Sequence, residues 1–239
     1  MKQIIVVTDG CSNQGISPVS AAAQAKVAGI TVNVIGVVDR NEIGEQGTEE
    51  IEAIAKAGGG LHRVVQTGQL ARTMQMMTRH TVAATIQGVV NQELKAIFQD
   101  KEAGIDSLEP HKRAQVVQSV EEWAETAPVR VALLIDTSAS MRTKMDAVKE
   151  AAADLLLSLR ARAGKSELSV LHFPGNNRSA ELDTPWTADL ANLDNILYKL
   201  NVKGTTPTGP ALLQAVRYIK DGTLGEDRIL NGAWGDYVV

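Results

Sequence analysis

The stretch MKQIIVVTDGCSNQG, residues 1–15, has the pattern of a buried strand that ends in an acidic residue. The apolar run at 4–7 leads into Thr8-Asp9-Gly10, so Asp9 is expected at the carboxyl end of a strand. A strand of this strength, with no lead-in, is more typical of the middle of a domain than of its start. We therefore expect another part of the sequence to supply the beginning of the domain.

The composition predicts a globular protein with an aliphatic core. Of the 239 residues, 44% are hydrophobic, 22% are charged and 3% are aromatic, so Ala, Val, Leu and Ile must fill the interior. A formal net charge of -4 and scattered Lys and Arg residues argue against a nucleic-acid or membrane partner. The single cysteine, Cys11, excludes an intramolecular disulfide and a multi-cysteine zinc site. With no signal-peptide or membrane-spanning pattern, we expect a cytoplasmic protein.

Val-rich strands alternate with helical patterns along most of the chain. The expected strands are 4–8, 30–37, 62–65, 129–136 and 166–173. The expected helices are 17–28, 49–57, 69–98, 144–160, 189–200 and 210–219. This order predicts an α/β fold with a doubly wound, mainly parallel sheet and helices on both of its faces.

Residues 91–128 interrupt this alternation. A charged loop is followed by a helical pattern that has Pro110 in its first turn and ends before Pro128. We interpret 91–128 as a helical connector between an α/β half at 1–90 and another at 129–220. Residues 221–239 have weak periodicity and are interpreted as a tail.

Oxygen-bearing side chains follow two predicted strands and precede one predicted helix. Asp136 ends strand 129–136 and opens a D-x-S-x-S pattern, Asp9 ends the first strand, and the loop 204–209 carries three threonines. Each feature alone has a plain structural explanation, as a helix cap or a turn residue. Open α/β sheets bind ligands at the carboxyl ends of their strands, and Mg²⁺ prefers oxygen ligands. Together the three loops predict a site for a hard cation.

On these residues the chain resembles a von Willebrand factor A-type (VWA) domain with an intact metal-ion-dependent adhesion site. The family motif combines D-x-S-x-S, a Thr in a Gly-Thr loop and an Asp in T-D-G. The resemblance assigns metal binding, directly or through water, to Asp136, Ser138, Ser140, Thr206 and Asp9. It implies Mg²⁺ (or Mn²⁺) as the cofactor and, as the partner, a protein that presents an acidic residue to the metal. The chain is also similar to small uncharacterised VWA proteins of spore-forming Gram-positive bacteria.

The order of the motifs departs from the family, in which D-x-S-x-S comes first and T-D-G later. Here the T-D-G half, 1–90, precedes the D-x-S-x-S half, 129–220. We interpret 1–239 as a single circularly permuted VWA domain whose original start lies near Val129. Two alternatives stay open at this stage: remnants of two tandem domains, and a domain-swapped dimer in place of a monomer.

By the resemblance, the function is metal-dependent binding of a protein and not catalysis. The alternatives are a magnesium-dependent phosphohydrolase and a subunit or adaptor of an ATPase assembly. Two enzyme-like patterns do not hold. The A-G-K-S run at 163–166 lacks the first glycine of a P-loop, where Leu159 stands, and it precedes a strand instead of a helix. A phospho-aspartate mechanism at Asp136 requires a second acid where Ser138 stands.

Overall fold

The computed structural model describes residues 1–39, 44–189, 191 and 206–224. Its six described strands form one sheet in the order β3-β2-β1-β4-β5-β6. The strands are β1 (Lys2–Thr8), β2 (Ile30–Val38), β3 (Gly59–Gln66), β4 (Val129–Asp136), β5 (Ser166–Phe173) and β6 (Glu181–Thr187). The described α-helices are α1 (Pro18–Val27), α2 (Glu45–Ala57), α3 (Leu70–Phe98), α4 (Pro110–Thr126), α5 (Met145–Arg160) and α7 (Thr208–Asp221).

The central pair of strands, β1 and β4, joins the two halves of the sequence. The two strands run parallel, in a register that extends from Lys2 beside Arg130 to Val7 beside Ile135. β2 and β5 extend the parallel sheet on either side, and β6 adds an antiparallel edge next to β5. The predicted doubly wound, mainly parallel α/β fold is therefore confirmed.

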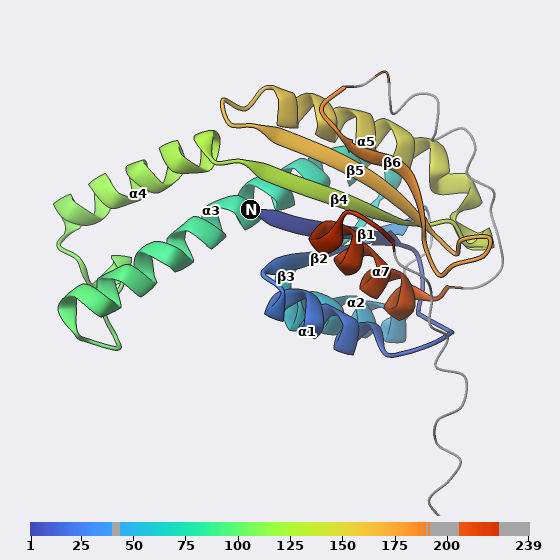
Figure 1. Ribbon diagram of the computed structural model, residues 1–239, viewed down its shortest axis with the longest axis horizontal. Helices are drawn as coiled ribbons and strands as arrows, with labels where there is room; N and C mark the ends of the chain where they lie inside the picture. The colour runs from blue at the N-terminus through green and yellow to red at the C-terminus, as the bar shows by residue number, and fades with distance from the viewer. Residues whose placement is uncertain (40–43, 190, 192–205, 225–239) are drawn as a thin grey trace, which may run out of the picture.

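Helices cover both faces of this sheet (Figure 1). On β1, Ile5 and Val7 point into a core that α3 and α5 complete. Ile4 and Val6 point the other way, into a core that α1, α2 and α7 complete. All four side chains are fully buried, because a parallel strand between two helical layers has no solvent face. This explains why the opening strand is a continuous apolar run.

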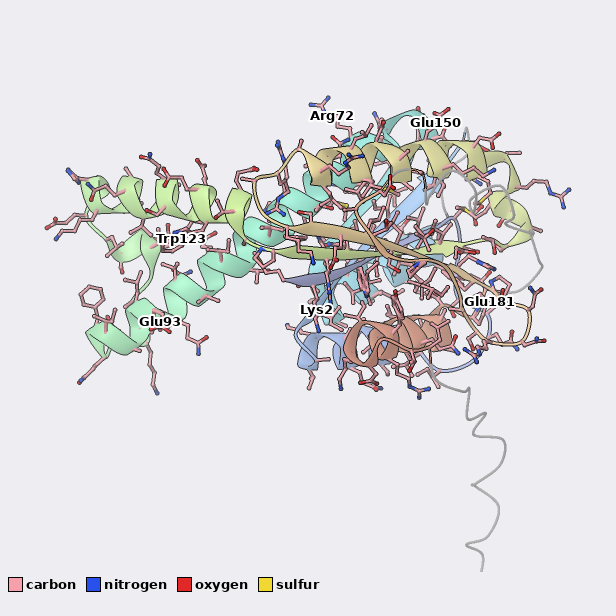
Figure 2. All side chains as sticks on the ribbon, turned by 45° about the horizontal axis from the view of Figure 1, so that its top comes forward. Lys2, Arg72, Glu93, Trp123, Glu150 and Glu181 are labelled. Atoms are coloured by element: carbon pink, nitrogen blue, oxygen red, sulfur yellow. The ribbon has the colours of Figure 1, made fainter. Side chains whose placement is uncertain are left out.

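Helices α3 and α4, with the loop between them, form a long helical hairpin that projects beyond the sheet and includes the predicted connector 91–128 (Figure 1). The buried residues of α3 end at Val82, and Val120 is the buried residue of α4. Figure 2 shows Glu93 and Trp123 on this hairpin, well away from Lys2 at the start of β1. In the described part of the chain, no helix combines the length and the hydrophobicity needed to cross a membrane.

Several predicted boundaries require correction. Helix α2 begins at Glu45 and not at 49, and strand β3 begins at Gly59 and not at 62. A Cβ on Gly60 would lie 2.1 Å from the carbonyl oxygen of Val32, so the glycines allow β3 to approach β2 closely. In the predicted loop 204–209, the last two residues belong instead to α7.

One strand was not predicted, and two expectations cannot be compared with the structure. β6 has polar residues and Pro185 in a partly exposed edge strand, so it lacks the apolar run that identified its neighbours. The predicted helix 189–200 and most of the tail 221–239 lie outside the described residues.

Candidate metal site

The carboxyl ends of β1 and β4 bring the two halves of the motif together. Asp9 follows β1, and Asp136 is the last residue of β4. A 3-10 helix, η3 (Ala139–Lys144), follows β4 and begins directly after Ser138. Ser140 Oγ donates a hydrogen bond of 2.8 Å to Asp9 Oδ1 across 131 residues of sequence. Two neighbouring parallel strands thus place Asp9 beside the D-x-S-x-S loop.

Asp136 is a fully buried carboxylate whose two oxygens both accept hydrogen bonds. The backbone N–H of Ser138 donates to Oδ1 at 2.8 Å, and Thr8 Oγ1 donates to Oδ2 at 2.7 Å. The pKa of Asp136 is raised to about 6, because burial, together with the charge of Asp9, raises it by more than the hydrogen bonds from Thr8 and Ser138 lower it. The two donors therefore stabilise a negative charge that burial alone would disfavour.

The hydroxyls of the motif form a short hydrogen-bonded chain. Ser138 Oγ and Ser140 Oγ lie 3.1 Å apart. Because Ser140 gives its one hydroxyl proton to Asp9, Ser138 must be the donor in that pair. The direction of donation is thus Ser138 to Ser140 to Asp9, and each serine oxygen keeps lone pairs for another ligand.

Thr206 lies next to the loop that follows Asp9, and it is held there by its backbone. Its N–H donates to Asn13 Oδ1 at 2.9 Å, and its carbonyl accepts from the N–H of Asn13 and from Ser12 Oγ. The side chain is buried, but no hydrogen bond of the described residues joins it to Asp136 or Asp9. Four of the five predicted ligands are therefore joined by hydrogen bonds, and metal binding by all five stays a prediction.

Two residues near the site were not predicted. Thr8 supports Asp136, and the only signal for it was its place in the T-D-G motif. Lys144 ends η3 and places Nζ 2.8 Å from Asp9 Oδ2 and 3.1 Å from the carbonyl oxygen of Ser140. A lysine in a basic, polar stretch gives no sequence signal for such a contact.

The donor set fits a hard divalent cation. It consists of two carboxylates and two serine hydroxyls, which are the oxygen ligands that Mg²⁺ and Mn²⁺ prefer. Within the described residues there is no group of three His, Cys, Asp or Glu side chains that could hold a metal ion.

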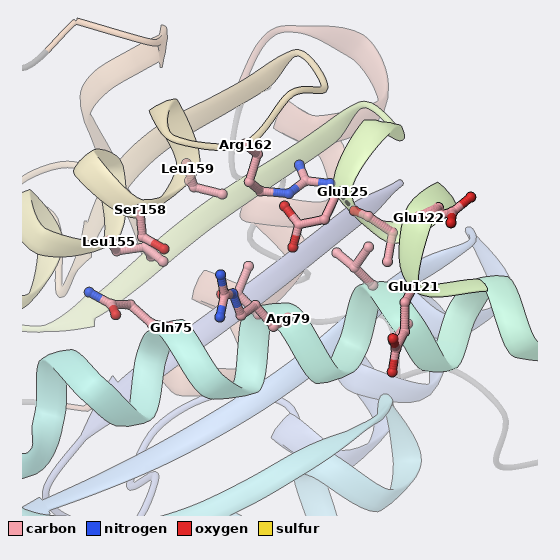
Figure 3. Close-up of a pocket in the computed structure, with 13 residues that line it drawn as sticks. Gln75, Arg79, Glu121, Glu122, Glu125, Leu155, Ser158, Leu159 and Arg162 are labelled. Atoms are coloured by element: carbon pink, nitrogen blue, oxygen red, sulfur yellow. Dashed lines mark hydrogen bonds between the residues drawn. The ribbon is translucent and has the colours of Figure 1, made fainter. Parts of the chain in front are cut away.

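A separate cavity of about 530 Å³ lies where the helical hairpin meets the α/β layers (Figure 3). Its lining includes Arg162, whose guanidinium donates to the carbonyl oxygens of Ala124 and Ala127 and to Ser166 Oγ. These contacts tie the end of α4 to the turn between α5 and β5. We interpret this region as a structural joint of the hairpin.

Comparisons with known proteins agree with the fold. Residues 131–230 match the von Willebrand factor type A domain. The chain is 47% identical over 215 residues to "Uncharacterized protein YabS" of Bacillus subtilis, which covers 90% of this chain and 87% of that protein. It is 43% identical to an uncharacterized protein from Alicyclobacillus acidocaldarius whose crystal structure aligns with a TM-score of 0.84, over 93% of this chain and 94% of that one.

A more distant similarity is to proximal thread matrix protein 1 of the mussel byssus, in a structure described as having a zinc-occupied MIDAS motif. That alignment has 15% identity and a TM-score of 0.31, over 95% of this chain and 48% of the mussel protein. At this level the similarity carries no argument about the site described above.

Proposed function

The chain belongs to the same family as Bacillus subtilis YabS and contains a match to the von Willebrand factor type A domain, and on that premise we propose that it is a divalent-metal-dependent protein-binding module. The observation that carries the proposal is the hydrogen-bonded chain from Ser138 through Ser140 to Asp9, which links residues from both halves of the sequence. The cofactor is Mg²⁺ or Mn²⁺.

Some residues of the site would supply oxygen ligands to the cation, and others would hold those ligands in place. Ser138 and Ser140 offer hydroxyl oxygens, and Thr206 offers a third from the loop before α7. Ser140 donates its hydroxyl hydrogen to Asp9, so the lone pairs of the Ser140 oxygen point away from Asp9. Thr8 and the N–H of Ser138 hold the Asp136 carboxylate in place. When bound, the cation supplies a positive charge that an acidic side chain of a protein partner can approach, in a contact strengthened by partial burial.

We further propose that the fold is a single circularly permuted domain. Starting at Val129, the strand sequence would be β4, β5, β6, β1, β2, β3, with D-x-S-x-S before T-D-G as in the family. The end of α7 and the start of β1 lie together, because Lys2 Nζ donates to the carbonyl oxygen of Ile219 at 3.3 Å.

The proposed activity is binding and not catalysis, and the proposed location is the cytoplasm. Where a phospho-aspartate mechanism would need a second acid, the structure has Ser138, whose hydroxyl is engaged with Ser140. A chain whose one cysteine, Cys11, is free is typical of a reducing compartment.

Metal titration tests the proposal. Chelator-stripped protein should bind one equivalent of Mn²⁺ or Mg²⁺, and Asp136→Ala and Ser138→Ala should each weaken binding by about tenfold or more, that is, by about 1.4 kcal/mol or more. Asp154→Ala and Ser158→Ala on α5 are matched controls that should bind like wild type. Because the ligands are all oxygen, we expect no preference for zinc of the kind sulfur ligands confer. Metal affinity that is unchanged by both Asp136→Ala and Ser138→Ala would refute the assignment of these residues as ligands.

The partner is tested by affinity capture with and without chelator. Capture should be lost in EDTA and with Thr206→Ala, and it should persist with Ser158→Ala. A partner that is retained equally in EDTA and with Thr206→Ala binds another surface and contradicts the proposal.

A further inference from the structure

Lys144 forms a partly buried ion pair with Asp9, one of the candidate metal ligands. The two side chains are 11% and 5% exposed, whereas in the surface pair between Lys112 and Glu109 they are 65% and 74% exposed. Removing two charges from water is costly unless further hydrogen bonds satisfy them. Here they do, since Lys144 Nζ also donates to the carbonyl oxygen of Ser140.

This ion pair completes the hydrogen bonding of Asp9. Ser140 Oγ donates to Oδ1 at 2.8 Å, and Lys144 Nζ donates to Oδ2 at 2.8 Å. Both carboxylate oxygens are therefore engaged by groups of the chain itself. The same ammonium compensates one of the two negative charges, Asp9 and Asp136, that lie at this edge of the sheet.

We propose that Lys144 is a built-in counter-ion that holds Asp9 as the hydrogen-bond partner of Ser140 and thereby weakens metal binding. The inference rests on the proposed function and deepens it. It assigns to Lys144 a positioning role: the ammonium keeps Asp9 oriented toward Ser140 and adds a positive charge that opposes the incoming cation. The bound cation then retains more of its own charge for an acidic group of the partner.

Removing the ammonium should have opposite effects on the metal-free and metal-bound protein. Without metal, Asp9 would be left buried near Asp136 with no counter-charge, so the protein should lose stability. With metal, the repulsion disappears and Asp9 becomes available to the cation, so binding should tighten. A lysine with only a structural role would lower both stability and metal affinity.

The experiment is a Mn²⁺ titration of full-length, chelator-stripped protein, with free Mn²⁺ followed by electron paramagnetic resonance. Lys144→Met and Lys144→Gln should bind Mn²⁺ about tenfold or more tighter than wild type. The repulsion between like charges a few ångströms apart, at an effective dielectric constant of about 20, corresponds to a change in affinity of more than about tenfold. Lys144→Arg keeps the charge and should stay near wild type. Lys149→Met removes the same charge from α5 outside the site and controls for net charge.

Thermal melts of the same variants supply the second readout. In EDTA, Lys144→Met and Lys144→Gln should melt below wild type, and saturating Mn²⁺ should raise their melting temperatures by more than it raises that of wild type. Unchanged or weaker Mn²⁺ binding in both variants, with normal binding by wild type, would overturn the role of Lys144. Absence of Mn²⁺ binding by wild type would instead overturn the proposed function. If Lys144→Met does not fold, Lys144→Gln decides the outcome.

Discussion

The hydrogen bond between Thr8 and Asp136 offers a sharp test of how the two halves of the chain support each other. Thr8 is 1% exposed and donates to a carboxylate that is fully buried. Thr8→Val has nearly the same shape but lacks the donor. Asp136 would keep the hydrogen bond from the N–H of Ser138 and lose the one from Thr8.

The expected cost follows from the chemistry of that contact. A hydrogen bond to a charged group contributes about 1.5–3 kcal/mol to stability. For a chain of this size, about 1 kcal/mol corresponds to about 2–4 °C, so metal-free Thr8→Val should melt roughly 3–12 °C below wild type. Thr8→Ser keeps the hydroxyl and loses one methyl group, so it should cost only about 1 kcal/mol.

Urea unfolding of the metal-free proteins, followed by circular dichroism, would measure these differences. A double-mutant cycle with Asp136→Ala isolates the contact, and we expect a coupling energy of about 1–3 kcal/mol. A residual cost in the Asp136→Ala background reflects the contact of Thr8 with Gly10, whose N–H lies 3.3 Å from Thr8 Oγ1. Equal costs of Thr8→Val in both backgrounds would refute the reasoning, because Thr8 would then act through packing alone.

Three further predictions concern the surroundings of the site and the joint of the hairpin. Gly209→Ala should destabilise the protein and weaken Mn²⁺ binding measured by calorimetry. A Cβ there would lie 2.0 Å from the carbonyl oxygen of Ile16 and displace the start of α7. Normal Mn²⁺ binding by this variant would contradict a role of the start of α7 in the site. Arg162→Met should lower the free energy of unfolding by about 1 kcal/mol, measured in urea, without changing Mn²⁺ affinity, because it leaves partly buried carbonyls at the end of α4 without this donor. A loss of metal affinity would mean that the joint and the site are coupled. Fragments 1–95 and 125–239, expressed separately, should be unfolded or aggregated by light scattering, because each exposes one edge of the β1–β4 pair; a cooperatively folded 1–95 would contradict the single-domain proposal.

The sequence was sufficient for the elements that carry a strong periodic signal. Strands β4 and β5 lie at the predicted bounds, and the 29-residue helix α3 begins within one residue of its predicted start. β4 is buried on both faces and has the continuous apolar run 131–135, whereas β5 is as deeply buried but includes the polar residues Ser169 and His172. β6 escaped prediction because an edge strand in contact with solvent tolerates polar residues and a proline.

Within the candidate site, the sequence predicted the candidate ligands but not the contacts of Thr8 and Lys144 with them. Asp136, Ser138 and Asp9 stand at strand ends, where topology alone brings side chains together. The contact between Lys144 and Asp9 depends on the 3-10 helix that turns the chain back over Ser140, and no pattern in the sequence specifies that turn. The side-chain position of Thr206 depends on a loop whose preceding residues lie outside the described structure.

The position of Asp9 beside Ser140 is also compatible with the proposed circular permutation. The contact depends on the pairing of β1 with β4, whose register brings Val7 beside Ile135. Parallel neighbours end at the same edge of a sheet whichever of them comes first in the chain. The connection between these two strands runs through the whole first half and the helical hairpin, and the hairpin contributes none of the site residues. The contact between Asp9 and Ser140 requires that both strands lie in one sheet, and the proposed permutation would preserve that pairing.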